Sequence, residues 1–191
     1  MKTNTLLSVL LVSLLALTGC KDSNEKAASP SAGAPATVVS IAAIATEARG
    51  FTVGSAMSVR TVYVFFDPQC PHCSELWRNA KPLNTKVRFV WIPVGLINAS
   101  STAQGATLLA AADPAAAMDE HEASMTAKRG GIGASSATDA HKAAVAKNTG
   151  LLNQFGFTSV PTIVSTHAQT GALVTNQGSM STAALSGLLG L

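Results

Sequence analysis

The sequence predicts an α/β fold in which helices flank a central mixed sheet. Two apolar runs rich in β-branched and aromatic residues, "RTVYVFF" (60–66) and "KVRFVWIPV" (86–94), predict strands that are buried on both faces. Between them, Pro71 stands where a proline fits the first turn of a helix, and the residues that follow it continue in a helical pattern. This order of strand, helix and strand has the length of a right-handed βαβ unit.

The remaining segments predict more helices and a second pair of strands. Residues 38–51 predict a short amphipathic helix, and a helical insertion is expected at about 102–153. The runs "TIVS" (162–165) and "ALVT" (172–175) predict two short strands joined by a turn. Ser181 is placed to cap a final helix that runs to the end of the chain.

Length and composition limit the possible classes of function. The 191 residues suit one domain that can bury a core without disulfides. Only 12% of the residues are charged, and the net charge of +3 is spread along the chain without a block of Lys and Arg. Nucleic acid is therefore not expected as a partner, because its phosphate backbone requires a concentrated basic surface.

The N-terminus predicts export. Lys2 precedes an apolar run (6–17) that has the length of a secretory signal and is too short to span a bilayer. The run ends in "LTGC" (17–20), which resembles the cleavage site of bacterial lipoproteins. Residues 1–19 are therefore expected to be a lipoprotein signal peptide, and Cys20 is expected to carry the lipid. The alternative is an ordinary signal peptide cut elsewhere, which leaves Cys20 as a free thiol.

The segment after the predicted cleavage site is expected to be a tether. Residues 20–37 are small, polar and rich in Pro and Gly, without apolar periodicity, which predicts a flexible coil behind the lipidated cysteine. By analogy with enterobacterial sorting, Lys21 favours the outer membrane. The expected location is thus the periplasm, with the domain held at the membrane through a lipid anchor.

The other two cysteines, Cys70 and Cys73, form a C-x-x-C pair that could have several chemical roles. In an oxidising compartment they can pair only with each other or with another molecule. Structural zinc needs four ligands, c-type haem needs a histidine where Ser74 stands, and a disulfide closing so short a loop adds little stability. The four histidines, His72, His121, His141 and His167, form no recognisable ligand motif. No metal or other cofactor is expected.

A working redox couple explains each position of the motif. Cys70 lies at the predicted start of a helix, where free N–H groups and the helix dipole favour a thiolate and lower its pKa. Cys73 lies one turn further on and can resolve a mixed disulfide by attacking Cys70. Pro71 stiffens the turn, and His72 can donate a hydrogen bond or place positive charge near the Cys70 sulfur. The alternative for His72 is a side chain that simply faces solvent.

The motifs "VFFDPQCPHC", "WIPVG" and "GFTSVPT" resemble those of periplasmic thiol:disulfide interchange proteins of the DsbG/DsbC type, which belong to the thioredoxin superfamily. The resemblance implies a thioredoxin-like catalytic domain over residues 38–191. It also implies that Pro161 is a cis-proline facing the cysteines and that the Val160 backbone binds an extended substrate. The alternative for Pro161 is a trans-proline opening an edge strand. Asp67 and Glu75 are candidates for proton relay or for surface roles.

Two departures from the family pattern refine the functional expectation. DsbG and DsbC carry an N-terminal dimerisation domain, which this chain does not show, so a monomer containing the catalytic domain only is expected. The "CPHC" motif and Val160 instead match the oxidase DsbA. The resemblance implies an isomerase or reductase that acts on exported protein thiols and disulfides. A membrane protein is expected to be its redox partner. A DsbA-like dithiol oxidase is the alternative, followed by a non-catalytic holdase or a Cu(I)-binding protein.

Overall fold

The structure, a computed structural model, describes residues 37–134 and 137–191. The predicted signal peptide, the predicted lipidation site at Cys20 and almost all of the predicted tether lie outside these ranges. Within them, none of the helices combines the length and apolar character needed to cross a membrane.

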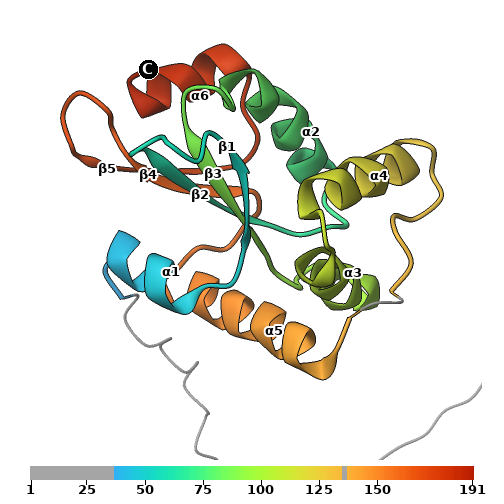
Figure 1. Cartoon of the computed structure of the whole chain (residues 1–191). Coiled ribbons are helices and arrows are strands. Elements are labelled where there is room, and N and C mark those ends of the chain that lie inside the picture. The colour runs from blue at the N-terminus through green and yellow to red at the C-terminus, as the bar shows by residue number, and fades with distance from the viewer. Residues whose placement is uncertain (1–36, 135–136) are drawn as a thin grey trace, which may run out of the picture. The chain divides into compact units, whose positions relative to one another are not determined.

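A five-stranded mixed sheet forms the centre of the fold (Figure 1). Its strand order is β1-β3-β2-β4-β5. Only β2 and β3 run parallel, and the pairs β1–β3, β2–β4 and β4–β5 are antiparallel. The strands are β1 (Phe51–Gly54), β2 (Thr61–Phe66), β3 (Arg88–Pro93), β4 (Thr162–Thr166) and β5 (Leu173–Gln177). The predicted α/β fold with a mixed sheet is thereby confirmed.

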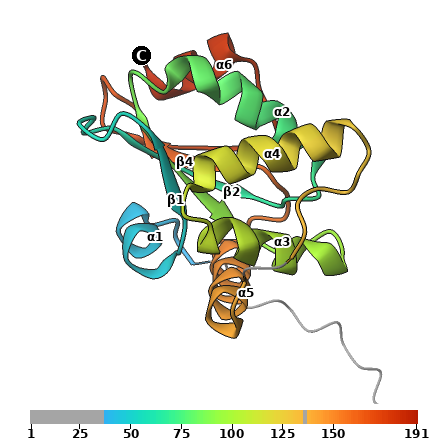
Figure 2. The same cartoon turned by 45° about the vertical axis from the view of Figure 1, so that its right-hand side comes forward.

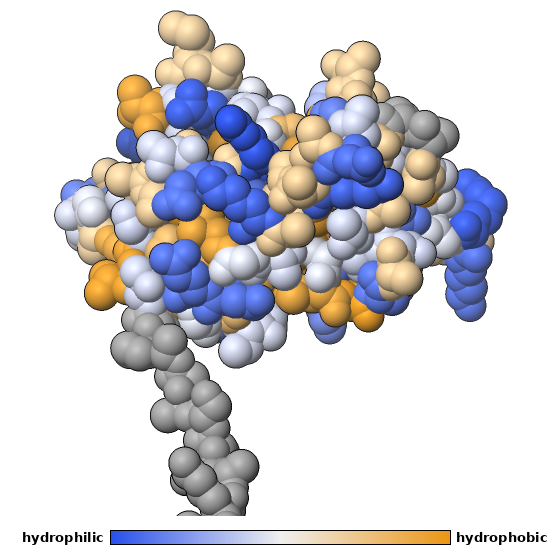
Figure 3. Space-filling model, turned by 90° about the horizontal axis from the view of Figure 1, so that it is seen from below, coloured by the Kyte–Doolittle hydropathy of each residue, from blue (hydrophilic) through white to orange (hydrophobic). Residues whose placement is uncertain are grey.

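Helices cover both faces of the sheet (Figures 1 and 2). One face packs against α2 and α6, and the other packs against α1 and α5. Seen from below, hydrophilic residues alternate with small patches of hydrophobic ones over the visible part of the surface (Figure 3). The helices are α1 (Ile41–Glu47), α2 (Pro71–Ala80), α3 (Ala99–Ala110), α4 (Pro114–Thr126), α5 (Asp139–Gln154) and α6 (Thr182–Leu189), with a 3-10 turn at Lys81–Leu83.

The central strand β2 supplies both hydrophobic cores because its side chains alternate between the two faces. Val62, Val64 and Phe66 belong to the core under α2 and α6. Tyr63 and Phe65 belong to the core over α1 and α5. A strand covered on both sides has to be almost continuously apolar, which is the pattern seen in the sequence.

The predicted helical segment at about 102–153 consists of three helices with two different roles. The last of them, α5, packs under the sheet and contributes Leu151 and Leu152 to the core it shares with α1. Of the other two, α3 packs against α5, and α4 lies between α3 and α2 (Figure 2). Asn98 and Asp113 cap these two helices, each accepting a hydrogen bond from a backbone N–H in the first turn.

The structure corrects one predicted element and adds another. The helix expected over residues 38–51 ends at Glu47, where the backbone at Ala48 becomes extended. Phe51–Gly54 forms a strand, β1, which the sequence did not predict. It pairs with β3 along its whole length, so its identity comes from backbone hydrogen bonds with a distant segment. The cap of the final helix by Ser181 is confirmed.

A buried asparagine joins α5 to the sheet, and we expect its removal to lower the stability of the protein strongly. Asn148 is fully buried, donates to the carbonyl oxygens of Arg49 (2.7 Å) and Pro93 (2.9 Å), and accepts from the N–H of Arg49 (2.9 Å). Asn148→Ala leaves these groups without partners, so the free energy of unfolding should fall by about 3 kcal/mol. Urea unfolding measures this loss. Asn153→Ala, at an exposed position of the same helix, is the control and should change stability by less than about 0.5 kcal/mol.

Candidate active site

Strand β2 delivers Cys70 to the first turn of α2. Cys70 is the N-cap residue of α2, and Pro71 occupies the first helical position as predicted. The Cys70 N–H donates to the Asp67 carbonyl (3.0 Å), and the Cys70 carbonyl accepts from the N–H groups of Cys73 (3.0 Å) and Ser74 (3.2 Å). Within residues 37–134 and 137–191 no side chain caps this helix end, so the Cys70 sulfur lies beside N–H groups that carry the positive end of the helix dipole.

The two cysteines are both free thiols and differ strongly in acidity. The hydrogen bond from the Cys73 side chain lowers the pKa of Cys70 to about 6, with help from the N–H groups of Cys73 and His72 and the charge of His72, against the effect of burial. Burial raises the pKa of Cys73 well above its usual range, and the neighbouring Cys70 raises it further. At neutral pH the pair therefore holds one thiolate, on Cys70, and one thiol, on Cys73.

The loop before β4 faces the Cys70 sulfur. The Val160 carbonyl oxygen lies 3.6 Å from Cys70 Sγ, and the Val160–Pro161 peptide bond is cis. These residues are 90 positions apart in the chain. They meet because β2 and β4 are antiparallel and pair Phe65 with Thr162, which places the residues before β4 opposite the residues after β2. The trans-proline alternative is thus wrong.

Asp67 is a buried structural anchor of the site, and the surface role considered for it is wrong. Its side chain is fully buried. The carboxylate accepts hydrogen bonds from the N–H of Gln69 (2.8 Å), Leu96 (2.7 Å) and Ile97 (3.0 Å). It thus joins the loop before Cys70 to the loop that follows β3. Leu96 and Ile97, held in this way, expose 41% and 48% of their surface.

His72 and Glu75 lie on the outer side of α2. Their side chains are 72% and 50% exposed, and His72 Nδ1 lies 3.7 Å from a Glu75 carboxylate oxygen. The His72 side chain therefore faces solvent and still lies close enough for its charge to favour the Cys70 thiolate. Glu75 is placed to balance that charge.

A polar network behind the cysteines was missed by the sequence reasoning. His121 of α4 is fully buried, with Nε2 2.7 Å from the carbonyl oxygen of Pro68, and its Nδ1 accepts from the N–H of Ile132 (3.2 Å). Gln104 of α3 donates to the carbonyl oxygens of Gly130 (2.7 Å) and Ile132 (3.1 Å). These bonds fasten the loop after α4 to the loop before Cys70. No motif marks them, because buried polar residues in helices lack a sequence signature.

The histidines considered as metal ligands are not brought together. His121 belongs to the network just described, His141 lies against Thr138 at the start of α5, and His167 accepts hydrogen bonds from the turn before β5. Across residues 37–134 and 137–191, no group of three or more His, Cys, Asp or Glu residues is placed to hold a metal ion.

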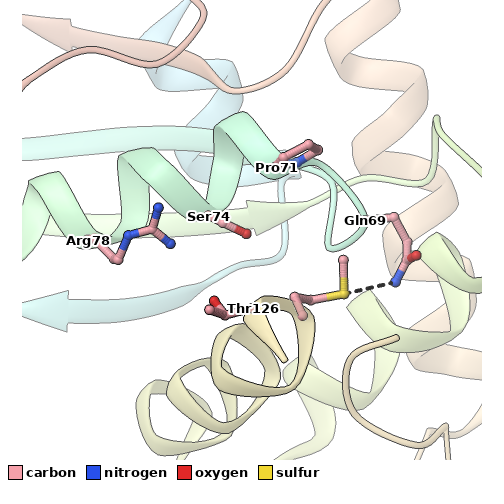
Figure 4. Close-up of a pocket in the computed structure, with 6 residues that line it drawn as sticks. Gln69, Pro71, Ser74, Arg78 and Thr126 are labelled. Carbon is pink, nitrogen blue, oxygen red and sulfur yellow. Dashed lines mark hydrogen bonds between the residues drawn. The ribbon is translucent and has the colours of Figure 1, made fainter. Parts of the chain in front are cut away.

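A hollow of about 250 Å³ opens beside the first turn of α2 (Figure 4). Its lining residues come from α2, from the loop before Cys70 and from α4: Gln69, Pro71, Ser74, Arg78, Met125 and Thr126. Gln69 Nε2 lies 3.6 Å from the Met125 sulfur and bridges the loop to α4. The space next to the cysteines is thus walled by polar and apolar side chains together.

Comparison with known proteins gives partial matches to two curated relatives. The thiol:disulfide interchange protein DsbG of Pseudomonas aeruginosa is 44% identical over 71 residues, which cover 36% of this chain and 28% of that protein. DsbG of Escherichia coli K12 is 35% identical over 104 residues, which cover 53% of this chain and 42% of that protein. The chain therefore spans less than half the length of these relatives.

Solved structures share the fold at low sequence identity. The catalytic domain of Proteus mirabilis ScsC is 15% identical, with a TM-score of 0.61 over 77% of this chain and 90% of that one. Pseudomonas aeruginosa DsbA2 is 18% identical, with a TM-score of 0.60 over 72% and 91% of the two chains. The thioredoxin-like domain family matches residues 54–190, from the end of β1 to the end of α6. The chain belongs to this thioredoxin-like family.

Proposed function

We propose that the protein is a periplasmic thiol-disulfide oxidoreductase that exchanges disulfides with exported proteins, as an isomerase or reductase of the DsbG type. The unequal cysteine pair carries this proposal. Cys70, with a pKa of about 6, is a thiolate at neutral pH, and the pKa of Cys73 lies well above the usual range, so Cys73 keeps its proton. A nucleophile next to a protected thiol is the arrangement that a two-step exchange needs.

The proposed exchange has two steps, formation of a mixed disulfide and its resolution. The Cys70 thiolate attacks one sulfur of a substrate disulfide, the substrate S–S bond breaks, and the other substrate sulfur leaves as a thiolate and takes up a proton. In reduction, Cys73 then loses its proton and attacks Cys70 Sγ, so the mixed disulfide breaks, the bound substrate sulfur leaves as a thiolate that takes up a proton, and the Cys70–Cys73 disulfide forms; the substrate gains two electrons in all. In isomerisation, another substrate thiolate attacks the substrate sulfur of the mixed disulfide instead, which forms a new substrate disulfide and releases the Cys70 thiolate.

The Val160–Pro161 loop is proposed to hold the substrate during these steps. The Val160 carbonyl already lies 3.6 Å from Cys70 Sγ. A substrate segment running antiparallel to this loop can bond to its backbone by strand addition, with the attacked sulfur above Cys70. Because such bonds use only main-chain groups, the site can accept substrates of different sequence.

Oxidation of substrates is the second candidate direction, and the acidity of Cys70 favours it. A thiol of low pKa is a good leaving group, so a Cys70–Cys73 disulfide passes readily to a substrate thiol. Trapping thiols in intact cells with acid and an alkylating mass tag distinguishes the directions. Mostly oxidised protein indicates an oxidase that a membrane partner recharges, and mostly reduced protein indicates an isomerase or reductase fed by a reducing partner.

The location at the membrane is proposed from the N-terminal sequence. Cleavage before Cys20 and lipidation of that residue would hold the domain on a coil formed by residues 20–37, with Lys21 favouring the outer membrane. Labelling with a fatty-acid analogue tests this anchor. The wild-type protein should incorporate the label. Cys20→Ser should not incorporate it and should be released into the soluble periplasm.

The order of the two steps predicts which variant traps substrates. Cys73→Ser keeps the nucleophile and removes the resolving thiol, so mixed disulfides between Cys70 and exported proteins should accumulate. Cys70→Ser, the matched control, should form none, because Cys73 is 1% exposed and protonated. Alkylation-trapped extracts run on non-reducing gels show the adducts. Absence of adducts in both variants would contradict the mechanism. If a variant that lacks both Cys70 and Cys73 still suppresses the aggregation of unfolded proteins, the protein is a holdase instead.

The acidity of Cys70 predicts a shifted pH profile. The rate of alkylation of Cys70 by iodoacetamide should rise with pH around a midpoint of about 6, because only the thiolate reacts. Since the Cys73 hydrogen bond is the largest cause of this low pKa, Cys73→Ala should move the midpoint upward, toward the ordinary range of a thiol. His72→Ala should move it upward by less. An unchanged midpoint in Cys73→Ala would show that the two sulfurs are not hydrogen-bonded.

A further inference from the structure

Two neighbouring hollows lie between α2 and α4, and the first of them is lined by Gln69 and Pro71, the two residues that flank Cys70 in the chain. The first, of about 250 Å³, lies next to Pro71 (Figure 4). The second, of about 480 Å³, extends along the two helices to Lys81 and Asp119. Arg78 and Thr126 line both hollows, so the two lie next to each other. We call this feature the α2–α4 groove.

Arg78 offers hydrogen-bond donors to this groove. Its guanidinium group extends along α2 toward Ser74, at the wall of the first hollow (Figure 4). Among the described residues no carboxylate lies within 4.0 Å of it. Lys81, by contrast, contacts Asp119 and lies over the ring of Trp77. Arg78 is thus the cation of the groove whose donors are free for a ligand.

Glu122 offers an acceptor in the same groove. Its side chain lines the second hollow, and the residue is only 7% exposed. Within the described part of the chain, its Oε2 atom is buried without a hydrogen-bond partner. Burial raises the pKa of Glu122, although the Ser74 hydroxyl and the charge of Arg78 act in the opposite direction. A buried acceptor without a donor is costly, so an incoming N–H group would relieve it.

A free donor and a free acceptor on the two sides of one groove complement the carbonyl and N–H groups of a polypeptide backbone. We propose that the α2–α4 groove binds the main chain of the substrate beyond its reactive cysteine, with Arg78 donating to a carbonyl and Glu122 accepting from an N–H. This inference rests on the proposed exchange function and names a second contact for the same substrate. A small anion fits less well, because the Glu122 carboxylate would repel it.

The dimensions of the groove set the length of the bound segment. It follows α2, whose ten residues extend over about 15 Å. An extended chain advances about 3.3 Å per residue, so four or five substrate residues would fill the groove. The groove begins at Gln69 and Pro71, on either side of Cys70, and therefore a substrate joined to Cys70 can enter it directly.

Reaction rates with peptides of increasing length test the proposal. The probes are Ala- and Ser-containing peptides with one cysteine, activated as the pyridyl mixed disulfide and extended by one to eight residues on either side. Cysteamine activated in the same way is the short probe. The ratio of the long-peptide rate to the short-probe rate should rise with extension on one side and level off at about four or five residues.

Variants of the groove should lower this ratio. Arg78→Ala and Glu122→Ala should each reduce it by about tenfold, as expected for the loss of a hydrogen bond to a charged group. Thr126→Trp, at an exposed position that lines both hollows, should reduce it as well by filling the space between them, without changing a charge. Arg60→Ala is the control and should leave the ratio unchanged, because this exposed arginine precedes β2 at the opposite end from Cys70.

The outcomes separate this inference from the exchange function. N-methylation of the peptide bonds beyond the cysteine should slow the wild-type protein and have less effect on the Arg78 and Glu122 variants. A ratio that is independent of length, or equal in the wild type and all groove variants, overturns the groove as a substrate site. A rate that depends on an acidic side chain in the peptide, but not on N-methylation of its peptide bonds, overturns main-chain recognition. Failure of Cys70 to react even with the short probe would instead contradict the exchange function.

Discussion

The antiparallel pairing of β2 with β4 is the constraint on which the candidate site depends. Because Phe65 is opposite Thr162, the chain leaves β2 toward Cys70 at the same edge where it enters β4 from Val160. The register is fixed by burial, since β2 packs on both faces and a shift by one residue would exchange its two sets of apolar side chains. The distance of 3.6 Å between Cys70 Sγ and the Val160 carbonyl oxygen thus follows from the packing of the whole sheet.

The positions of Cys70 and Cys73 on α2 explain why two identical side chains differ in chemistry. Cys70 is held at the helix N-terminus, where backbone N–H groups and the Cys73 thiol stabilise its negative charge. Cys73 lies one turn deeper, in the core that β2 forms with α2, where burial disfavours a charge. The lowered pKa of Cys70 and the raised pKa of Cys73 reinforce each other, because the hydrogen bond that favours the Cys70 thiolate requires Cys73 to keep its proton.

The strands β2 and β3, helix α2 and the position of Cys70 could be predicted because each leaves a local pattern: continuous burial, a first-turn proline and a C-x-x-C spacing. Strand β1 could not, since its four residues become a strand only by pairing with β3. The position of Val160 opposite Cys70 was available only through family resemblance, because the two are 90 residues apart. The surface role considered for Asp67 is wrong for a related reason: its donors at Leu96 and Ile97 come from a distant loop.

Helix α4 connects the position of the nucleophile with the proposed groove. His121 faces the loop before Cys70 and lies 2.7 Å from the Pro68 carbonyl, whereas the next residue, Glu122, faces the groove. Successive residues on a helix point about 100° apart, so one short segment can serve both surfaces. Two adjacent side chains of one helix therefore contribute to both the loop that positions Cys70 and the proposed groove.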